Sequence, residues 1–263
     1  SQWHAIANIR VTDLAGNAMD QNANGIGGEM ADAFGFSFTT STPASAPAVA
    51  SVAGRGVLLK NSSLDATNSA DSINLALAAA DDDGVIAAGV SALLPGQTAG
   101  PENRTNFSQG INGLVVDIAN MSAESLTAAD FTFRVGTAGD PSAWQDAPAP
   151  TSVTVRAGAG VGDSSRVTLT WANGSIVGCW LEVTVLSDAS GGHAGLGADD
   201  VFYFGNLPGN ANGDGIVDAA DFIALKQAFG SRSASPGGSA DFDGSGAVDS
   251  GDLLTLTGSF GQS

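Results

Sequence analysis

Short runs of alternating apolar and polar residues recur through the middle of the chain, from residue 56 to residue 207. In one of them, RVTLTW, Val167, Leu169 and Trp171 fall on one face and the two threonines between them on the other. A period of two residues is typical of a strand with one buried face. The other runs are GVLLK, INLALAA, INGLVVDIA, FTFRVG, SVTVRA, CWLEVTVL and VFYFG. Such runs, separated by loops, favour an antiparallel β-sandwich or jelly roll over a parallel α/β sheet.

The N-terminal part of the chain has a sparser pattern. Residues 1–40 contain two alternating runs, HAIANIRVTD and FGFSFTT, with a segment rich in turn residues between them. This predicts two strands, which are too few to build a stable sandwich alone. Residues 41–55, STPASAPAVASVAGR, are rich in Pro, Ala and Ser and predict a linker.

Closely spaced Asn and Asp residues begin at residue 210 and lead into apolar residues at helical spacing. Counted from Asn210, oxygen-bearing side chains occupy positions 1, 3, 5, 9 and 12, and Gly215 occupies position 6. This is the ligand spacing of an EF-hand calcium loop, in which the glycine permits a sharp turn and the carbonyl at position 7 is also a ligand. The predicted ligands are Asn210, Asn212, Asp214, the carbonyl of Ile216, Asp218 and Asp221.

The same spacing returns 31 residues later, with glycine again at position 6. Here the predicted ligands are Asp241, Asp243, Ser245, the carbonyl of Ala247, Asp249 and Asp252. Each loop opens a helix pattern that ends at a glycine, Gly230 in the first and Gly261 in the second. The apolar helix positions are Phe222, Leu225 and Phe229, then Leu253, Leu256 and Phe260. We therefore predict two calcium sites, each at the start of a short helix.

Position 12 is Asp rather than Glu in both loops, and no helix pattern precedes either one. In these respects residues 209–263 resemble the dockerin, the calcium-binding module that docks onto cohesin domains in cellulosome-type assemblies. The resemblance implies two calcium ions, two helices related by pseudo-two-fold symmetry, and a cohesin-like protein partner. Loop positions 10 and 11 contact the partner in dockerins. Here they are Ala219 and Ala220, then Ser250 and Gly251, which differ from the hydroxyl-rich pairs common in cellulosomal members.

Two further resemblances concern the rest of the chain. The segments VTDLAGNAMDQNANGIGGE and FGFSFTT resemble the closing strands of bacterial immunoglobulin-like domains. The segments LLPGQTAG, GINGLVVDIA, ADFTFRVG, VTVRAGAGVG and DDVFYFGN resemble an unnamed module that precedes dockerin-like repeats in large secreted bacterial proteins. The expected organisation is an immunoglobulin-like end at 1–40, a linker at 41–55, a β-sandwich at 56–207 and a dockerin-like domain at 208–263.

The charge of the chain favours cations as ligands. There are 27 acidic and 9 basic residues, a formal net charge of -18, which disfavours nucleic acid and anionic lipid as partners. No apolar run is long enough to span a bilayer. Residues 209–263 hold seven aspartates against Lys226 and Arg232. Two Ca²⁺ ions would offset most of this charge, so we expect calcium to be required for folding there.

Other candidate sites are less well supported by the sequence. The segment DQNANGIGGEMAD begins like a calcium loop, and predicts either a third site, with Asp20, Asn22 and Asn24, or a hydrogen-bonded hairpin loop. His4 and His193 lie in different segments without the spacing of a zinc site, and no nucleophile motif is present. We therefore predict no catalytic residues and no enzyme activity.

The amino-acid composition favours a secreted protein. The 36 glycines and few basic residues are typical of a secreted β-protein with tight turns. The single cysteine, Cys179, excludes an internal disulfide, so bound calcium is the candidate stabilising element. The first ten residues, SQWHAIANIR, lack the basic start and apolar core of a signal peptide, and we expect a mature or excised chain.

Two functional hypotheses remain open from the sequence. The first is a non-catalytic, extracellular or cell-surface assembly module that binds a cohesin-like domain or other copies of itself, as a homo-oligomer or filament. The second is a carbohydrate-binding accessory module of a secreted polysaccharide-degrading enzyme. Trp180 is predicted on the outer face of its strand and Trp144 in a loop, where aromatic rings could stack on a polysaccharide.

Overall fold

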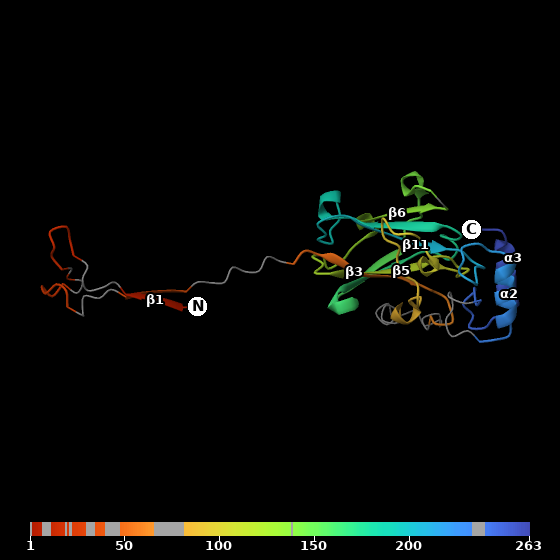
Figure 1. The fold of residues 1–263 in the computed structure, drawn as a ribbon, viewed down its shortest axis with the longest axis horizontal. Helices are drawn as coiled ribbons and strands as arrows, with labels where there is room; N and C mark the ends of the chain where they lie inside the picture. The colour runs from red at the N-terminus through yellow and green to blue at the C-terminus, as the bar shows by residue number, and fades with distance from the viewer. Residues whose placement is uncertain are drawn as a thin grey trace. The chain divides into compact units, whose positions relative to one another are not determined.

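The structure is a computed structural model that describes residues 2–6, 12–18, 20, 23–29, 35–39, 48–65, 82–137, 139–232 and 240–263. It divides into two compact units, Ser1–Ala48 and Val49–Ser263 (Figure 1). The predicted strand INLALAA, residues 73–79, lies outside the described residues. Within the described part of the chain, every helix is too short or too polar to cross a membrane.

The first unit contains a two-stranded antiparallel sheet. Strand β1 (Gln2–Ile6) pairs with β2 (Gly35–Thr39), with Trp3 opposite Phe38. The predicted run at 34–40 matches β2, whereas the run at 4–13 overlaps β1 only at residues 4–6, and residues 12–18 form a turn. The two strands pair with each other within one chain. Between them the carboxylate of Asp13 accepts hydrogen bonds from the amides of Ala15 and Asn17, both at 2.9 Å, which closes a tight turn. The resemblance to an immunoglobulin-like domain stays a prediction.

The second unit contains nine strands, among the described residues, in two sheets. The five-stranded sheet has the order β4 (Arg104–Thr105), β11 (Asp200–Asn206), β10 (Trp180–Val185), β6 (Phe131–Gly136) and β7 (Gln145–Asp146). The four-stranded sheet has the order β3 (Ser51–Leu58), β5 (Gly113–Ala119), β9 (Ser165–Thr170) and β8 (Ser152–Arg156). All neighbouring strands are antiparallel except β4 and β11. Short 3-10 helices lie in the connections: η3 (Asp82–Val85), η4 (Pro101–Asn103), η5 (Ala128–Asp130), η6 (Pro141–Ala143), η7 (Val161–Asp163) and η8 (Asp188–Ser190).

The two sheets lie face to face as a β-sandwich, and the predicted fold class is confirmed (Figure 1). Alternate residues of the longer strands enter the shared core, whose fully buried members include Leu114, Val116 and Ile118 of β5, Val167 and Leu169 of β9, Leu181 and Val183 of β10, and Phe202 and Phe204 of β11. Trp171, directly after β9, is 5% exposed, and its ring meets that of Phe133 edge to face at 5.3 Å. Its Nε1 donates to the carbonyl of Pro148 at 2.8 Å, which satisfies the one polar atom that the indole buries.

Strand β3 begins at Ser51, inside the range expected to be linker. Gly54 and Gly56 interrupt the apolar pattern of this strand, which is why the alternation does not reveal it. Gly54 pairs with Asp117 of β5, and a Cβ at Gly54 would lie 2.9 Å from an oxygen of that carboxylate. The glycine therefore makes room for a buried charge on the neighbouring strand.

That charge belongs to an ion-pair network on the outer face of the four-stranded sheet. Asp117 is 2% exposed, and Arg166, its cross-strand neighbour, donates to both of its oxygens at 2.8 Å. The third nitrogen of the Arg166 guanidinium and the guanidinium of Arg156 both donate to Asp83, at 2.7 and 2.6 Å. The hydrogen bonds to Asp117 raise the pKa of Arg166 above its ordinary value, although burial lowers it. The network joins β5, β8, β9 and η3.

The chain ends in two helices of ten residues, α2 (Ala219–Ala228) and α3 (Ser250–Ser259), at one end of the sandwich (Figure 1). Each begins with a capping box, formed by Asp218 and Asp221 in α2 and by Asp249 and Asp252 in α3. They share a small core made of Leu207, Val217, Leu225, Ala240, Phe242, Val248 and Leu256.

The two loop–helix repeats are joined reciprocally. The amide of Gly261, after α3, donates to the carbonyl of Val217 in the first loop, and the amide of Gly230, after α2, donates to the carbonyl of Val248 in the second, both at 2.8 Å. Val217 and Val248 are 31 residues apart, as are Gly230 and Gly261. The glycine after each helix therefore donates the same hydrogen bond to the loop of the other repeat. This reciprocity is that of a pseudo-two-fold axis, as the sequence resemblance implied.

Candidate calcium sites

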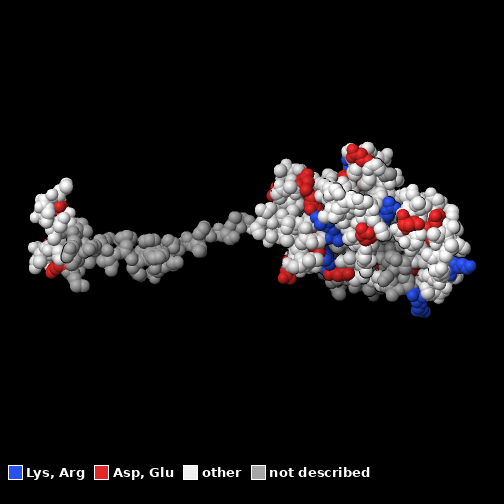
Figure 2. All heavy atoms as spheres, viewed as in Figure 1, with Lys and Arg blue, Asp and Glu red and all other residues white. Residues whose placement is uncertain are grey.

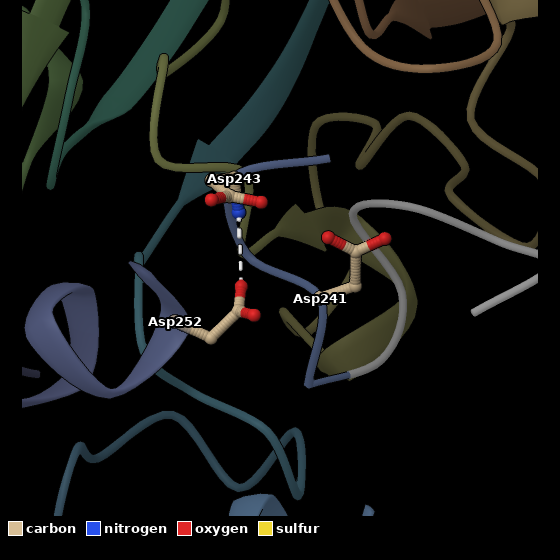
Figure 3. Close-up of side chains that lie close together, drawn as sticks. All are labelled: Asp241, Asp243 and Asp252. Carbon is tan, nitrogen blue, oxygen red and sulfur yellow. Dashed lines mark hydrogen bonds between the residues drawn. The ribbon is translucent and has the colours of Figure 1, made fainter. Parts of the chain in front are cut away.

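Three carboxylates of the second loop converge at the start of α3. Asp241, Asp243 and Asp252 each offer an oxygen atom, and these atoms all lie within 4.8 Å of one another (Figure 3). Asp241 and Asp252 are fully buried, and Asp243 is partly buried. Like charges packed so closely away from water repel strongly, so this geometry favours a bound cation.

Backbone amides hold these carboxylates in place. Asp252, in the first turn of α3, accepts from the amides of Phe242 at 2.6 Å and Asp243 at 3.2 Å, and its other oxygen accepts from Asp249 at 2.9 Å. Asp241 accepts from the amide of Gly246 at 2.9 Å. Gly246 has a φ of 88°, a conformation that a residue with a Cβ adopts only with strain. The loop is thus folded around its acidic side chains.

The protonation of this cluster reflects its burial. Burial, together with the neighbouring charges of Asp252 and Asp243, raises the pKa of Asp241 to about 6, although the hydrogen bond from the amide of Gly246 lowers it. Burial also raises the pKa of Asp252, although the amides of Asp249 and Asp243 oppose this. Both shifts mean that the ionised carboxylates are incompletely compensated by the protein alone. Hard oxygen donors of this kind fit Ca²⁺.

The first loop repeats the arrangement. Asp221 is fully buried, and one oxygen accepts from Ala211 at 2.7 Å and Asn212 at 3.1 Å while the other accepts from Asp218 at 2.8 Å. These donors occupy the same loop positions as those on Asp252. Gly215 has a φ of 87°, matching Gly246. The first loop therefore has the backbone frame of the second.

The two loops differ in charge. Positions 1 and 3 are Asn210 and Asn212 in the first loop, whereas both are aspartate in the second. The side-chain amide of Asn212 donates to the carboxylate of Asp214 at 2.9 Å, which brings positions 3 and 5 together. In the second loop the hydroxyl of Ser245 lies 3.1 Å from the carbonyl oxygen of Ala247, which brings positions 5 and 7 together. Counting all predicted ligands, the first loop offers three carboxylates and the second four.

A comparison with known protein families gives a match for this part of the chain. Residues 208–260 match the dockerin type I domain. Dockerin type I domains bind calcium and cohesin partners, and we refer to residues 208–263 as the dockerin-like domain. Searches of curated proteins and of solved structures found no match.

The dockerin-like domain is anchored to the sandwich through both candidate calcium loops. The amide of Ser108 donates to the carbonyl of Phe242 at 2.7 Å, and the amide of Ser63 donates to that of Gly244 at 2.6 Å. In the first loop, the side-chain amide of Asn106 donates to the carbonyl of Asn210 at 3.0 Å. Sequence reasoning missed these contacts, because nothing in the local pattern around residues 104–108 signals a partner so far along the chain.

Both helices also expose large apolar side chains. Ile223 is 54% and Leu254 is 74% exposed, and these residues are 31 apart; Phe229 and Phe260, also 31 apart, are 52% and 57% exposed. The symmetric repeats therefore present equivalent apolar residues to solvent. Exposed apolar patches of this kind often mark interaction surfaces.

The third predicted site is only partly described. Asn22 lies outside the described residues. Asp20 accepts from the amides of Asn24 at 3.1 Å and Gly25 at 2.6 Å, and Asn24 accepts from Ile26 at 2.8 Å. The bond from Gly25 to Asp20 matches the one from Gly246 to Asp241. Both a calcium loop and a hydrogen-bonded hairpin loop contain such bonds, so a third site stays a prediction.

The distribution of charge agrees with the small number of basic residues. On the face of the second unit shown in Figure 2, Lys and Arg side chains are interspersed with Asp and Glu rather than gathered in a continuous basic surface. Several arginines of the described residues are held in ion pairs, including Arg55 with Asp200 at 2.6 Å.

Proposed function

We propose that this chain is a non-catalytic, extracellular assembly module whose dockerin-like domain binds two calcium ions and then a protein partner. The observation that carries the proposal is the convergence of Asp241, Asp243 and Asp252 in a buried cluster, within a loop whose backbone frame the first loop repeats. The ligands of the first ion are Asn210, Asn212, Asp214, the carbonyl of Ile216, Asp218 and Asp221. Those of the second are Asp241, Asp243, Ser245, the carbonyl of Ala247, Asp249 and Asp252.

Calcium supplies the positive charge that these loops lack. Metal binding to such a site is coupled to folding, because the ligands are brought together only in the folded chain. The domain is short and its shared core is small, so it has little else to hold its aspartates together. Calcium at the concentrations found outside cells would keep both loops filled.

The partner surface lies on the two helices. Ile223 and Leu254 provide exposed apolar contacts, and the small residues at the helix starts, Ala219 and Ala220 in α2 and Ser250 and Gly251 in α3, allow close approach of another chain. The partner that this surface and the family fit best is a cohesin-like domain. The pseudo-two-fold symmetry offers it two similar ways to dock.

A second copy of the chain is the alternative partner. Strands β1 and β2 form a sheet of two strands, whose outer edges carry backbone groups that can pair with another sheet. A pair of strands alone is marginally stable, so addition of this sheet to a neighbouring copy would stabilise it. Repeated head to tail, such pairing produces a homo-oligomer or filament.

The absence of catalysis is part of the proposal. His4 belongs to β1, whereas His193 follows η8 and its Nδ1 lies 2.6 Å from Asp130. The imidazole is 75% exposed, and the buried carboxylate of Asp130 that it contacts also accepts from the amide of Thr127, so this carboxylate has a structural role in the capping of η5.

The test of partner binding uses biolayer interferometry on the immobilised full chain, with a panel of purified cohesin domains in calcium and in EDTA. The expected result is binding in calcium alone, weakened at least tenfold by Ile223→Asp combined with Leu254→Asp. Lys226→Ala, an exposed polar position on the same helix, is the matched control and should bind normally. Binding that persists in EDTA, or an affinity that is the same in the double variant and the native chain, contradicts the proposal. Light scattering of the free chain in calcium distinguishes a cohesin partner from self-assembly.

A further inference from the structure

We propose that the outer face of the five-stranded sheet carries a binding groove for a neutral carbohydrate, built around Trp144, Trp180 and Tyr203. These side chains line a cavity of about 390 Å³ together with Leu93, Leu94, Pro95, Gly96, Gln97, Ala99, Gly139 and Pro141. The volume is within the range of small-molecule sites. The groove is separate from the calcium loops and shares no residue with the predicted calcium ligands.

Two glycines let the tryptophan rings lie against the sheet. Trp180 of β10 is directly opposite Gly136 of β6 and Gly205 of β11. A Cβ at Gly136 would lie 2.3 Å from the ring of Trp144, and one at Gly205 would lie 2.7 Å from Cγ of Arg104 and 3.3 Å from the ring of Trp180. The guanidinium of Arg104 lies over the Trp180 ring, 4.9 Å from its centroid. One cross-strand row of the sheet thus supports both large aromatic rings, over positions that have no side chains of their own.

The next row of the sheet is polar. Glu182 of β10 is opposite Tyr203 of β11 and Arg134 of β6. Burial, together with a hydrogen bond to Glu182, raises the pKa of Tyr203 to about 12, so the phenol keeps its proton. The ring of Tyr203 meets that of Trp144 edge to face at 6.0 Å. A carboxylate–phenol pair therefore borders the aromatic floor.

The walls of the groove are preformed turns. On one side Leu93 pairs with Tyr203 through two backbone hydrogen bonds of 2.9 Å. The turn from Leu94 to Gln97 that follows is closed by a 3.1 Å bond between their backbones and by a 2.9 Å bond from the Leu94 amide to the Gln97 side chain. On the other side Arg134 donates to the carbonyl of Pro141 at 3.2 Å. Preformed walls reduce the conformational entropy that the protein loses when a ligand binds.

The chemistry of the groove fits a pyranose better than other occupants. A sugar ring presents a C–H face, which suits an aromatic surface, and a rim of hydroxyl groups, which donate to a carboxylate and exchange hydrogen bonds with a phenol. Glu182 faces Arg134 across the strands and Arg104 lies over the Trp180 ring, so acidic and basic groups offset each other beside the aromatic floor and suit a neutral ligand. The acidic chain as a whole disfavours an anionic one. A proline-rich peptide also docks in aromatic grooves, and the experiment below separates it from a sugar.

The groove joins residues that the sequence pattern treats separately. Trp180 is confirmed on the outer face of its strand, since Leu181, Val183 and Val185 are buried. Trp144 follows η6, and Tyr203 lies on β11. If the rings served only to cover the sheet, they would still pack on Gly136 and Gly205 but would bind no ligand. A binding experiment distinguishes this structural role from a carbohydrate site.

The test is native affinity electrophoresis of the full chain in gels that contain hydroxyethyl cellulose, xylan or laminarin, followed by tryptophan fluorescence titration with the polymer that retards it. We expect retardation in at least one gel. Trp180→Ala and Trp144→Ala should each weaken binding at least tenfold. Tyr203→Phe, which keeps the packing and removes the hydroxyl, should weaken it severalfold.

Phe260→Ala, which removes an exposed aromatic ring from the dockerin-like domain, is the matched control and should bind normally. No retardation in any of the three gels overturns the proposal. So does retardation that survives Trp180→Ala, or fluorescence titration that reveals binding of a proline-rich peptide in place of the polymers. Because the variants do not touch calcium ligands, failure here leaves the calcium proposal intact.

Discussion

The backbone amide of Ser108, in the sandwich, donates a 2.7 Å hydrogen bond to the carbonyl of Phe242, between two predicted ligands of the second calcium site. Phe242 is fully buried, as is Phe107 beside Ser108. A Cβ at Gly244 would lie 2.8 Å from the ring of Phe107, so the loop approaches the sandwich as closely as its backbone allows. The shape of the calcium loop and the end of the sandwich are therefore determined together.

We predict that calcium stabilises the sandwich as well as the dockerin-like domain. The four tryptophans, Trp3, Trp144, Trp171 and Trp180, all precede residue 209, so tryptophan emission reports on the chain outside the calcium loops. A site filled at ~100-fold above its Kd contributes about 2.7 kcal/mol. In EDTA the thermal transition seen by tryptophan emission should fall by several degrees.

The Asp243→Ala variant controls for non-specific effects of calcium in this melt. It should lose part of the calcium-dependent shift, because one site is removed. A tryptophan transition at the same temperature in calcium and EDTA, while the helical circular dichroism signal changes, would show that the two domains are independent.

A second prediction concerns pH, through Asp241. Its pKa is raised to about 6, chiefly by burial. Between its ordinary value of 3.8 and pH 6, the metal-free folded state therefore holds a proton on this carboxyl group that the unfolded state has lost. The stabilisation from this proton is complete below the ordinary value of 3.8 and is lost as the pH rises through 6. In EDTA this group should therefore lower stability towards neutral pH, by up to about 3 kcal/mol. Calcium affinity should change in the opposite sense and weaken below pH 6.

Asp241→Asn is the matched variant for this prediction, because the first loop already carries Asn210 at the same position. In EDTA the variant should be more stable than the native chain at pH 7, with a flatter profile between pH 4.5 and 6.5. Urea unfolding across that range measures it. An unchanged profile in the variant would mean that Asp241 is not the group that titrates.

A third prediction concerns the ion-pair network of the four-stranded sheet. Arg166→Met leaves Asp117 buried without its bidentate partner, and breaking a buried pair in this way costs about 3–5 kcal/mol. Replacing both residues, with Asp117→Leu and Arg166→Met together, should cost less than the single change, since no charge is left buried. Denaturant unfolding of the two variants compares them. Equal stability of the single variant and the native chain would contradict the assignment.

The sequence predicts local features well where the pattern is periodic. Val167, Leu169 and Trp171 are buried as the alternation requires, and the predicted loop spacing brings Asp241, Asp243 and Asp252 together. It does not predict β4 and β7, because two-residue strands are too short to show a period. Nor does it predict β3 from Ser51, where glycines replace the apolar residues.

Contacts between distant segments are the larger gap. Trp144 and Trp180 line one groove because Trp144 packs over Gly136, and Gly136 pairs with Trp180 across β6 and β10. No local sequence pattern encodes that register. The bond from Ser108 to Phe242 spans more than half of the chain in the same way. The sequence indicates the individual aromatic and acidic residues. It does not indicate that the aromatic residues line one groove or that the loops bond to the sandwich, because those contacts exist only in the folded chain.

Isothermal titration calorimetry of the full chain counts the calcium ions that the two loops bind. We expect two ions bound by the loops, with the second loop tighter because it offers four carboxylates and the first offers three. Asp214→Ala and Asp243→Ala should each remove one ion. An ion kept by the double variant would indicate a third site, for which the loop at Asp20 is the candidate. Titration that shows no calcium binding, or binding unchanged in both single variants, would show that these loops are not calcium sites.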